Sequence, residues 1–136
     1  MKKLITYPTM IIIAIMAFSS CQTGQPTQSV ANCDLLFSHH VFFWLNDPDN
    51  PEDRAAFERG VAELLTIPEI RAYHLGVPAP VEERPVVEAS YTYSYLVFFD
   101  DIEGHDIYQD HPIHSKFVEE YSYLWDRVVV YDSVMD

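Results

Sequence analysis

The residues best suited to proton chemistry lie between Tyr108 and His114, in the sequence Tyr-Gln-Asp-His-Pro-Ile-His. Pro112 suits the first position of a helix, because the N–H that it lacks would have no partner within the helix there. Asp110 or His111 can then serve as the helix cap. His114 falls in the first turn, where the positive end of the helix dipole disfavours an imidazolium. We therefore expect a neutral His114 that exchanges a proton near pH 7, beside a Tyr108 phenol able to hold a carbonyl or enol oxygen.

Two other interpretations of this stretch stay open. Asp-His-Pro is an ordinary way to begin a helix, so His111 and His114 are also typical of capping or surface residues. Two histidines at i, i+3 can share a helix face and hold a metal ion, but the sequence identifies no third and fourth ligand. The sequence therefore predicts no metal site.

The first 20 residues are predicted to be an export signal. Lys2 and Lys3 form a basic start, an apolar run extends from Met10 to Phe18, and small residues precede Cys21. The segment is too short and wrongly flanked for a membrane span. Its end resembles a bacterial lipobox, with Phe18 where that motif more usually has Leu. The resemblance implies cleavage before Cys21 and lipid on its thiol, with ordinary secretion as the alternative.

Residues 21–34 are predicted to comprise the lipidated cysteine and a flexible tether, because the segment from Gln22 to Ala31 is polar and shows no periodicity. An acylated Cys21 would leave Cys33 without a partner in the chain, so no disulfide framework is expected. These features predict an exported protein of the cell envelope, anchored by lipid to a bacterial membrane.

The charge of the chain excludes polyanionic partners. The formal net charge is −13, and it becomes −15 once Lys2 and Lys3 leave with the signal. Such an acidic protein is repelled by nucleic acid and by anionic lipid head groups. We expect no nucleic-acid partner, and membrane contact only through the lipid on Cys21.

Residues 35–136 are predicted to form one α+β domain with the order β-α-β-β-α-β. Strands are expected at 35–45, 70–77, 91–99 and 127–132. Helices are expected at 51–66 and 112–123, with a shorter helix at 101–109 that Gly104 interrupts. Residues 78–89 hold too many prolines for regular structure and form a long hairpin arm. This pattern predicts an antiparallel sheet with helices on one face.

The strand at 35–45 is apolar on both faces. One face holds Phe37, Val41, Phe43 and Leu45, and the other holds Leu36, His40, Phe42 and Trp44. By the same alternation, His39 and His40 point to opposite faces. So short a chain has helices for one face only, and an apolar second face needs other cover. We therefore expect a homodimer.

The strand at 91–99 carries a row of aromatic residues. Alternation places Tyr91, Tyr93 and Tyr95 on one face, which makes a hydrophobic surface with polar tips. Such a surface is either a packed interface or the wall of a pocket for an aromatic or polyketide-like ligand. Tyr93 and Tyr95, with Phe42 and Trp44, are therefore candidate ligand contacts.

Several separated motifs together resemble the stress-responsive dimeric α/β barrel domain, or Dabb. They are the opening His40-Val41-Phe42-Phe43, the strand from Tyr93 to Phe99 followed by Asp, and Tyr-x-x-His-Pro-x-His followed by Phe-Val-Glu-Glu. The resemblance extends from about Ser38 to Ser133. It implies a ferredoxin-like fold in which two subunits close their sheets into a shared barrel.

One member of that family, a plant polyketide cyclase, forms olivetolic acid by intramolecular aldol condensation. Its catalytic Tyr and His match Tyr108 and His114, and a pocket histidine of its first strand matches His40. The resemblance implies that His114 removes a proton next to a carbonyl and that Tyr108 stabilises the oxyanion. His111, in the same motif, is a ligand-binding candidate. Tyr93 stands where that enzyme has a histidine, which points to a different substrate.

Three hypotheses follow for the function. The first is a small-molecule binding module of the cell envelope, linked to stress and holding an apolar or aromatic compound. The second is an acid-base enzyme of the cyclase or isomerase kind that uses Tyr108 and His114. The third is a structural dimer whose aromatic faces are only core and interface. Distant relatives with the same barrel bind haem, but no histidine here has a recognisable axial-ligand context, so no cofactor is expected.

Overall fold

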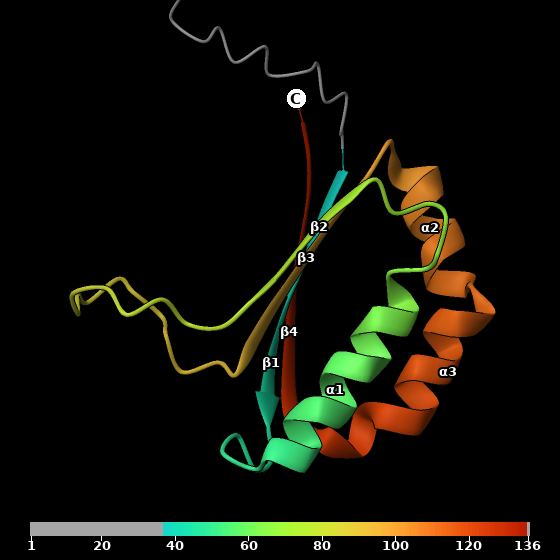
Figure 1. The fold of residues 1–136 in the computed structure, drawn as a ribbon. Coiled ribbons are helices and arrows are strands. Elements are labelled where there is room, and N and C mark those ends of the chain that lie inside the picture. The colour runs from blue at the N-terminus through green and yellow to red at the C-terminus, as the bar shows by residue number, and fades with distance from the viewer. Residues whose placement is uncertain (1–36, 136) are drawn as a thin grey trace, which may run out of the picture. The chain divides into compact units, whose positions relative to one another are not determined.

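The computed structural model describes residues 37–135 as a four-stranded sheet with three α-helices (Figure 1). The predicted export signal, the tether with Cys21, and the first two residues of the strand expected at 35–45 lie outside the described residues. Within residues 37–135, no helix combines the length and the apolar character that crossing a membrane requires.

The described chain follows the predicted order, including the two separate helices expected at 101–109 and 112–123. The elements are β1 (Phe37–Leu45), α1 (Pro51–Leu64), β2 (Ala72–Gly76), β3 (Tyr93–Phe99), α2 (Ile102–Asp110), α3 (Pro112–Tyr121), the 3-10 turn η1 (Ser122–Leu124) and β4 (Trp125–Val134). The predicted α+β class is confirmed. The last strand is longer than the expected 127–132, because β4 pairs with β1 along nearly its whole length.

The sheet has the strand order β2-β3-β1-β4, and every neighbouring pair is antiparallel. This is the order of a ferredoxin-like fold. The central strand β1 places Val41 opposite Tyr95 of β3 and Val130 of β4. All three helices lie on one side of the sheet (Figure 1), and we call that side of the sheet the helix face and the other the open face.

Side-chain caps fix where the helices of the second half begin. The Asp101 carboxylate accepts a hydrogen bond of 2.8 Å from the Gly104 N–H at the start of α2. The helix continues through Gly104, so the predicted interruption there is wrong. His111 Nδ1 accepts a 3.2 Å hydrogen bond from the Ile113 N–H and caps α3, which Pro112 begins. Of the two residues proposed as cap, it is His111 that serves.

Aromatic packing between the helix face and the helices forms the core. Phe57 of α1 is fully buried, and its ring lies 4.9 Å from that of Phe43 and stacks on Tyr93 at 4.6 Å. The stacked rings of Phe117 and Trp125, 5.5 Å apart, join α3 to the start of β4. This cluster fixes the distance between the helices and the sheet at one end.

The prediction that three tyrosines form a row on one face of the strand is wrong. Strand β3 begins at Tyr93, and the preceding Tyr91 packs its ring against Phe42 at a centroid distance of 4.9 Å. Phe42 belongs to the open face, so Tyr91 does not continue the row. Only Tyr93 and Tyr95 share the helix face, because the irregular arm reaches nearly to β3 and strand alternation starts after it.

The open face carries the aromatic residues of β1 that the alternation predicted. His40, Phe42 and Trp44 are partly exposed there, while the intervening residues of β1 are buried. Tyr131 of β4 lies opposite His40 and packs edge-on against Phe42 at 6.1 Å. No helix of the described residues covers this surface (Figure 1).

Candidate functional site

A cavity of about 310 Å³ lies between the helix face and the helices. Its size is at the lower end of the range for small-molecule pockets. Its polar lining residues are His39, Tyr95, Tyr108, Gln109 and His114. Its apolar lining residues are Val41, Phe43, Val61, Leu64, Phe117, Val118, Trp125, Val128 and Val130. The cavity thus combines an apolar wall with a small group of polar side chains.

Tyr108 of α2 is buried at the polar end of the cavity. Its ring lies 4.9 Å from that of His114 and 5.9 Å from that of His39. Its hydroxyl donates a long hydrogen bond of 3.5 Å to the Tyr95 hydroxyl. Burial raises the pKa of Tyr108 to about 12 and also raises the pKa of Tyr95. Both side chains are therefore phenols at neutral pH, able to donate a hydrogen bond to an oxygen in the cavity.

His114 lies in the first turn of α3 and lines the cavity. Burial is the main cause that lowers its pKa, and the nearby His39 lowers it further. The pKa shift has the direction expected from the sequence, but desolvation is its main source. A neutral His114 beside the Tyr108 ring can accept a proton from a bound molecule.

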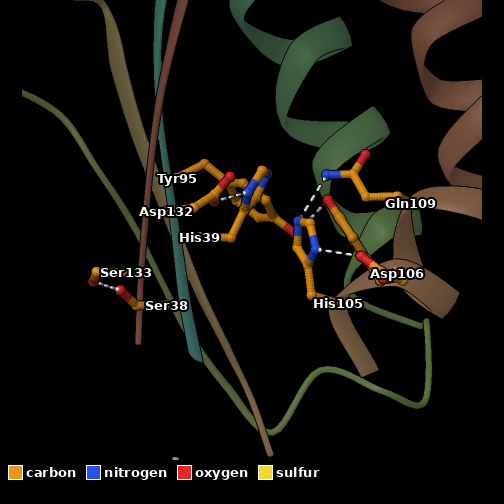
Figure 2. A network of polar contacts seen from close by, with 9 residues as sticks. Ser38, His39, Tyr95, His105, Asp106, Gln109, Asp132 and Ser133 are labelled. Carbon is orange, nitrogen blue, oxygen red and sulfur yellow. Dashed lines mark hydrogen bonds and ion pairs between the residues drawn. The ribbon is translucent and has the colours of Figure 1, made fainter. Parts of the chain in front are cut away.

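A third polar side chain of the cavity, His39, was missed by the sequence analysis. It is 5% exposed, and its Nδ1 lies 2.7 Å from the Asp132 carboxylate of β4 (Figure 2). Burial lowers the pKa of His39 more than Asp132 raises it. The carboxylate fixes the orientation of the imidazole, because it accepts the hydrogen bond from Nδ1. The rings of His39 and His114 thus lie 5.9 Å and 4.9 Å from the Tyr108 ring.

The other site residues predicted from the sequence divide into those that line the cavity and those that do not. Tyr95, Tyr108 and His114 line the cavity together. Tyr93 does not line it, because its ring stacks on Phe57 and its hydroxyl donates a 2.6 Å hydrogen bond to Glu58. His111 also lies outside the cavity lining, where it caps α3.

His40, Phe42 and Trp44 lie on the open face, away from this cavity. His40 Nε2 is 2.7 Å from the Ser94 hydroxyl, and the Trp44 indole N–H donates to Ser90 at 2.9 Å. The expectation that His40 shares a pocket with Tyr108 is wrong. The odd-numbered residues of β1 face the helices, so His39 takes that place. The alternation had separated the two histidines, but it did not indicate which of them meets the helices.

Potential metal ligands converge at one place in residues 37–135. One ligand atom each from His39, His105 and Asp132 lies within 4.8 Å of the others. The His111 and His114 pair considered from the sequence belongs to no such group of three among these residues.

The sequence comparison identifies a family for nearly all of the described chain. Residues 37–135 match the family described as the Stress responsive A/B Barrel Domain, or Dabb. A search of curated proteins found no match.

The comparison with solved structures finds the same fold in distant relatives. A Dabb family protein of Mesorhizobium loti with a ferredoxin-like fold has a TM-score of 0.62 and 20% identity, over 74% of this chain and 96% of that chain. A dimeric ferredoxin-like protein of unknown function from Thermobifida fusca has a TM-score of 0.58 and 21% identity, over 73% and 90%. The hydroxynitrile lyase of Passiflora edulis has a TM-score of 0.62 and 19% identity, over 74% and 94%. These likenesses confirm the ferredoxin-like fold of the chain.

Proposed function

The chain belongs to the Dabb family, and on this basis we propose that its domain binds a small, mostly apolar compound in the cavity between sheet and helices. The observation that carries the proposal is the cavity of about 310 Å³ with its largely apolar lining. The polar group of the compound would lie at the end where His39, Tyr108 and His114 meet. A compound of this kind gains hydrophobic burial from the wall and orientation from the few polar side chains.

The first test is native mass spectrometry of the full chain purified from its host, followed by denaturation to release bound molecules. We expect a defined small molecule to be released from the wild type. Val130→Trp should abolish this, because Val130 lines the cavity from the edge strand β4. Val86→Trp is the control, since Val86 is 88% exposed on the arm. An empty wild type, or equal loading of the Val130→Trp variant, would contradict binding in this cavity.

The second candidate function is acid-base catalysis on a carbonyl compound, of the cyclase or isomerase kind. It is favoured by the proximity of two histidine rings, at 4.9 Å and 5.9 Å, to a buried phenol. His114 would remove a proton next to the carbonyl, and the Tyr108 hydroxyl would donate to the oxyanion that forms. One protein with this fold is a hydroxynitrile lyase. The same fold can therefore hold an active site.

The test of catalysis uses enolisable aromatic ketones as probes. Exchange of the α-proton for deuterium, followed by NMR, reports proton removal without requiring the natural substrate. We expect Tyr108→Phe and His114→Ala each to slow exchange by about 10²-fold or more. His74→Ala is the control, because His74 is exposed on β2. If exchange by both cavity variants equals that of the wild type, the enzyme hypothesis fails and ligand binding alone remains.

We also infer that the protein is an envelope lipoprotein with Cys21 as the lipidated residue. The lipobox-like end of the predicted signal supports this. Expression of the wild type should yield a membrane-bound chain with a diacylglycerol mass increment at Cys21, and Cys21→Ser should yield a chain without it. A wild-type chain that is recovered in the culture medium without lipid would favour ordinary secretion instead.

A further inference from the structure

A group of metal-ligating side chains converges at the end of the cavity beside Tyr108. His39 of β1 and Asp132 of β4 are neighbours across the sheet, and His105 of α2 lies to the right of them in Figure 2. One ligand atom from each lies within 4.8 Å of the others. We propose that His39, His105 and Asp132 form a binding site for a divalent transition-metal ion such as Zn²⁺.

The donor set has the chemistry that such an ion prefers. Two imidazoles and one carboxylate bind Zn²⁺ at about 2.0–2.2 Å each and leave further coordination positions open. The same combination is used for Fe²⁺ in non-haem sites. Since all three residues are supplied by elements of the folded sheet and its covering helix, the site needs no additional segment of chain.

The first two ligands are joined by a hydrogen bond, so an ion bound between them would displace the proton on His39 Nδ1. His39 Nδ1 and Asp132 Oδ1 are 2.7 Å apart, whereas adjacent ligands on one ion, with bonds of about 2.1 Å, are separated by about 3.0–3.4 Å. The ring centroids of His39 and His105 are 5.2 Å apart. The ligand atoms of the three residues lie within 4.8 Å of one another, so binding one ion would draw them together by up to about 1.4–1.8 Å.

The hydrogen-bond partners of His105 favour a neutral tautomer that can bind a metal ion through Nε2. Its Nδ1 lies 3.2 Å from the Asp106 carboxylate, and its Nε2 lies 3.1 Å from the Gln109 amide (Figure 2). A proton on Nδ1 that is donated to Asp106 leaves the lone pair on Nε2, where a bound ion would replace the hydrogen bond from the Gln109 amide. A carboxylate that holds the second nitrogen of an imidazole is the usual support of a metal-binding histidine. The ring also stacks on Phe37 at 4.5 Å, which restricts its orientation.

The two histidines of the cluster are buried, whereas its aspartate is partly exposed to solvent. The side chains of His39 and His105 are 6% and 13% exposed, whereas that of Asp132 on the edge strand is 43% exposed. An ion can therefore enter from the β4 edge. The net charge of −13 raises the concentration of cations near the protein.

Metal binding would compete with the use of His39 as a proton acceptor. A nitrogen that holds the ion cannot take a proton at the same time. The three proposed ligands do not include Tyr108 or His114, so metal binding can be measured whether or not the cavity holds an organic compound.

The test is a titration of the full chain with Zn²⁺ in competition with a chromophoric chelator. We expect one site with a Kd in the micromolar range or tighter. His105→Gln and Asp132→Asn should each weaken binding by 10-fold or more, as loss of a ligand or its close partner does in other metal sites. Both cysteines stay present in every variant, so the difference between variants reports on this cluster.

Matched controls come from the same chain. His74→Gln and Asp110→Asn change exposed residues outside the cluster and should leave the affinity within about twofold. Co²⁺ provides a second readout, because its visible absorption should be lost in His105→Gln while the circular dichroism stays unchanged. Absence of binding at 100-fold excess metal, or a His105→Gln variant that binds as the wild type does, would overturn the proposal.

Discussion

The two faces of the sheet share the strand β1 but differ in what surrounds its side chains. On the helix face, His39 is enclosed by α2, and its nitrogen is held by Asp132. On the open face, His40 is partly exposed and bonded to the Ser94 hydroxyl. Consecutive histidines in one strand thus have different chemistry, because only one of them is covered by helices and paired with a carboxylate.

The difference teaches that aromatic character alone does not identify a binding surface in this protein. Both faces of the sheet carry several aromatic residues, but among residues 37–135 the cavity with polar side chains belongs to the helix face. The open face is left without helices in the described part of the chain and carries apolar residues of β1, so the expected homodimer would form there. The following predictions compare the two faces directly.

The largest effect is expected for Phe43 when it is compared with its neighbour Phe42. Phe43→Ala should lower the free energy of unfolding by about 3–5 kcal/mol, because a buried aromatic ring is lost from the core. Phe42→Ala should cost less than half of this under conditions where the protein is monomeric. Urea denaturation of both variants measures the difference. Equal costs would mean that the two faces are equally important to the folded subunit.

The second effect concerns the association of subunits. Phe42→Glu should convert the dimer to a monomer at micromolar concentration, because a charge on the open face would be buried without a partner. Val86→Glu, on the exposed arm, should leave the dimer intact. Sedimentation velocity distinguishes the two states. A wild type that is already monomeric, or a Phe42→Glu variant that stays dimeric, would exclude the open face as the interface.

A third, smaller effect is the loss of stability at acidic pH. Burial lowers the pKa of His39, His40 and His114 below the usual 6.5. The unfolded chain therefore takes up protons before the folded chain does. The histidine contribution is fully present above about pH 6.5 and is lost as the pH falls through that value toward the lower folded pKa values.

This pH dependence separates the two faces. His114→Gln should flatten the change in unfolding free energy between pH 7 and 5 more than His40→Gln does, because His40 is only partly buried and solvent weakens its desolvation. Denaturation in the presence of a chelator at several pH values measures this. A steeper pH dependence in His114→Gln than in the wild type would contradict the assignment.

The smallest effect is expected at the margin of the open face. The Arg127 guanidinium lies over the Trp44 ring at 4.0 Å, and an exposed contact of this kind contributes about 0.5–1 kcal/mol. Arg127→Ala should lower the free energy of unfolding by that amount, with Arg59→Ala on the exposed side of α1 as the control. If the two variants are equally stable, the contact adds nothing to stability.

Local features of the chain allowed most of the fold to be predicted. The Asn50-Pro51 start of α1, the Pro112 start of α3 and the alternation in β1 depend on neighbours within a few residues, and such signals are readable in a sequence. Boundaries were less accurate where pairing across the sheet decided them, as at both ends of β4 and at the start of β3.

Only the part of the candidate site that lies within one short motif was predicted from the sequence. Tyr108 and His114 are six positions apart and belong to one motif, so their proximity follows from a helix entry. His39, His105 and Asp132 come from three elements far apart in the chain, and only the sheet and α2 bring them together. No spacing in the sequence connects them.

The sequence by itself determined the order of the elements, the two apolar faces of β1 and the placement of a phenol and an imidazole six residues apart around the start of α3. The tertiary structure alone decided which face of β1 meets the helices, and hence that His39 rather than His40 lines the cavity. Alternation divides a strand into two sets of side chains, but when both sets are apolar it does not say which set is covered. That choice is made by packing against α1, α2 and α3.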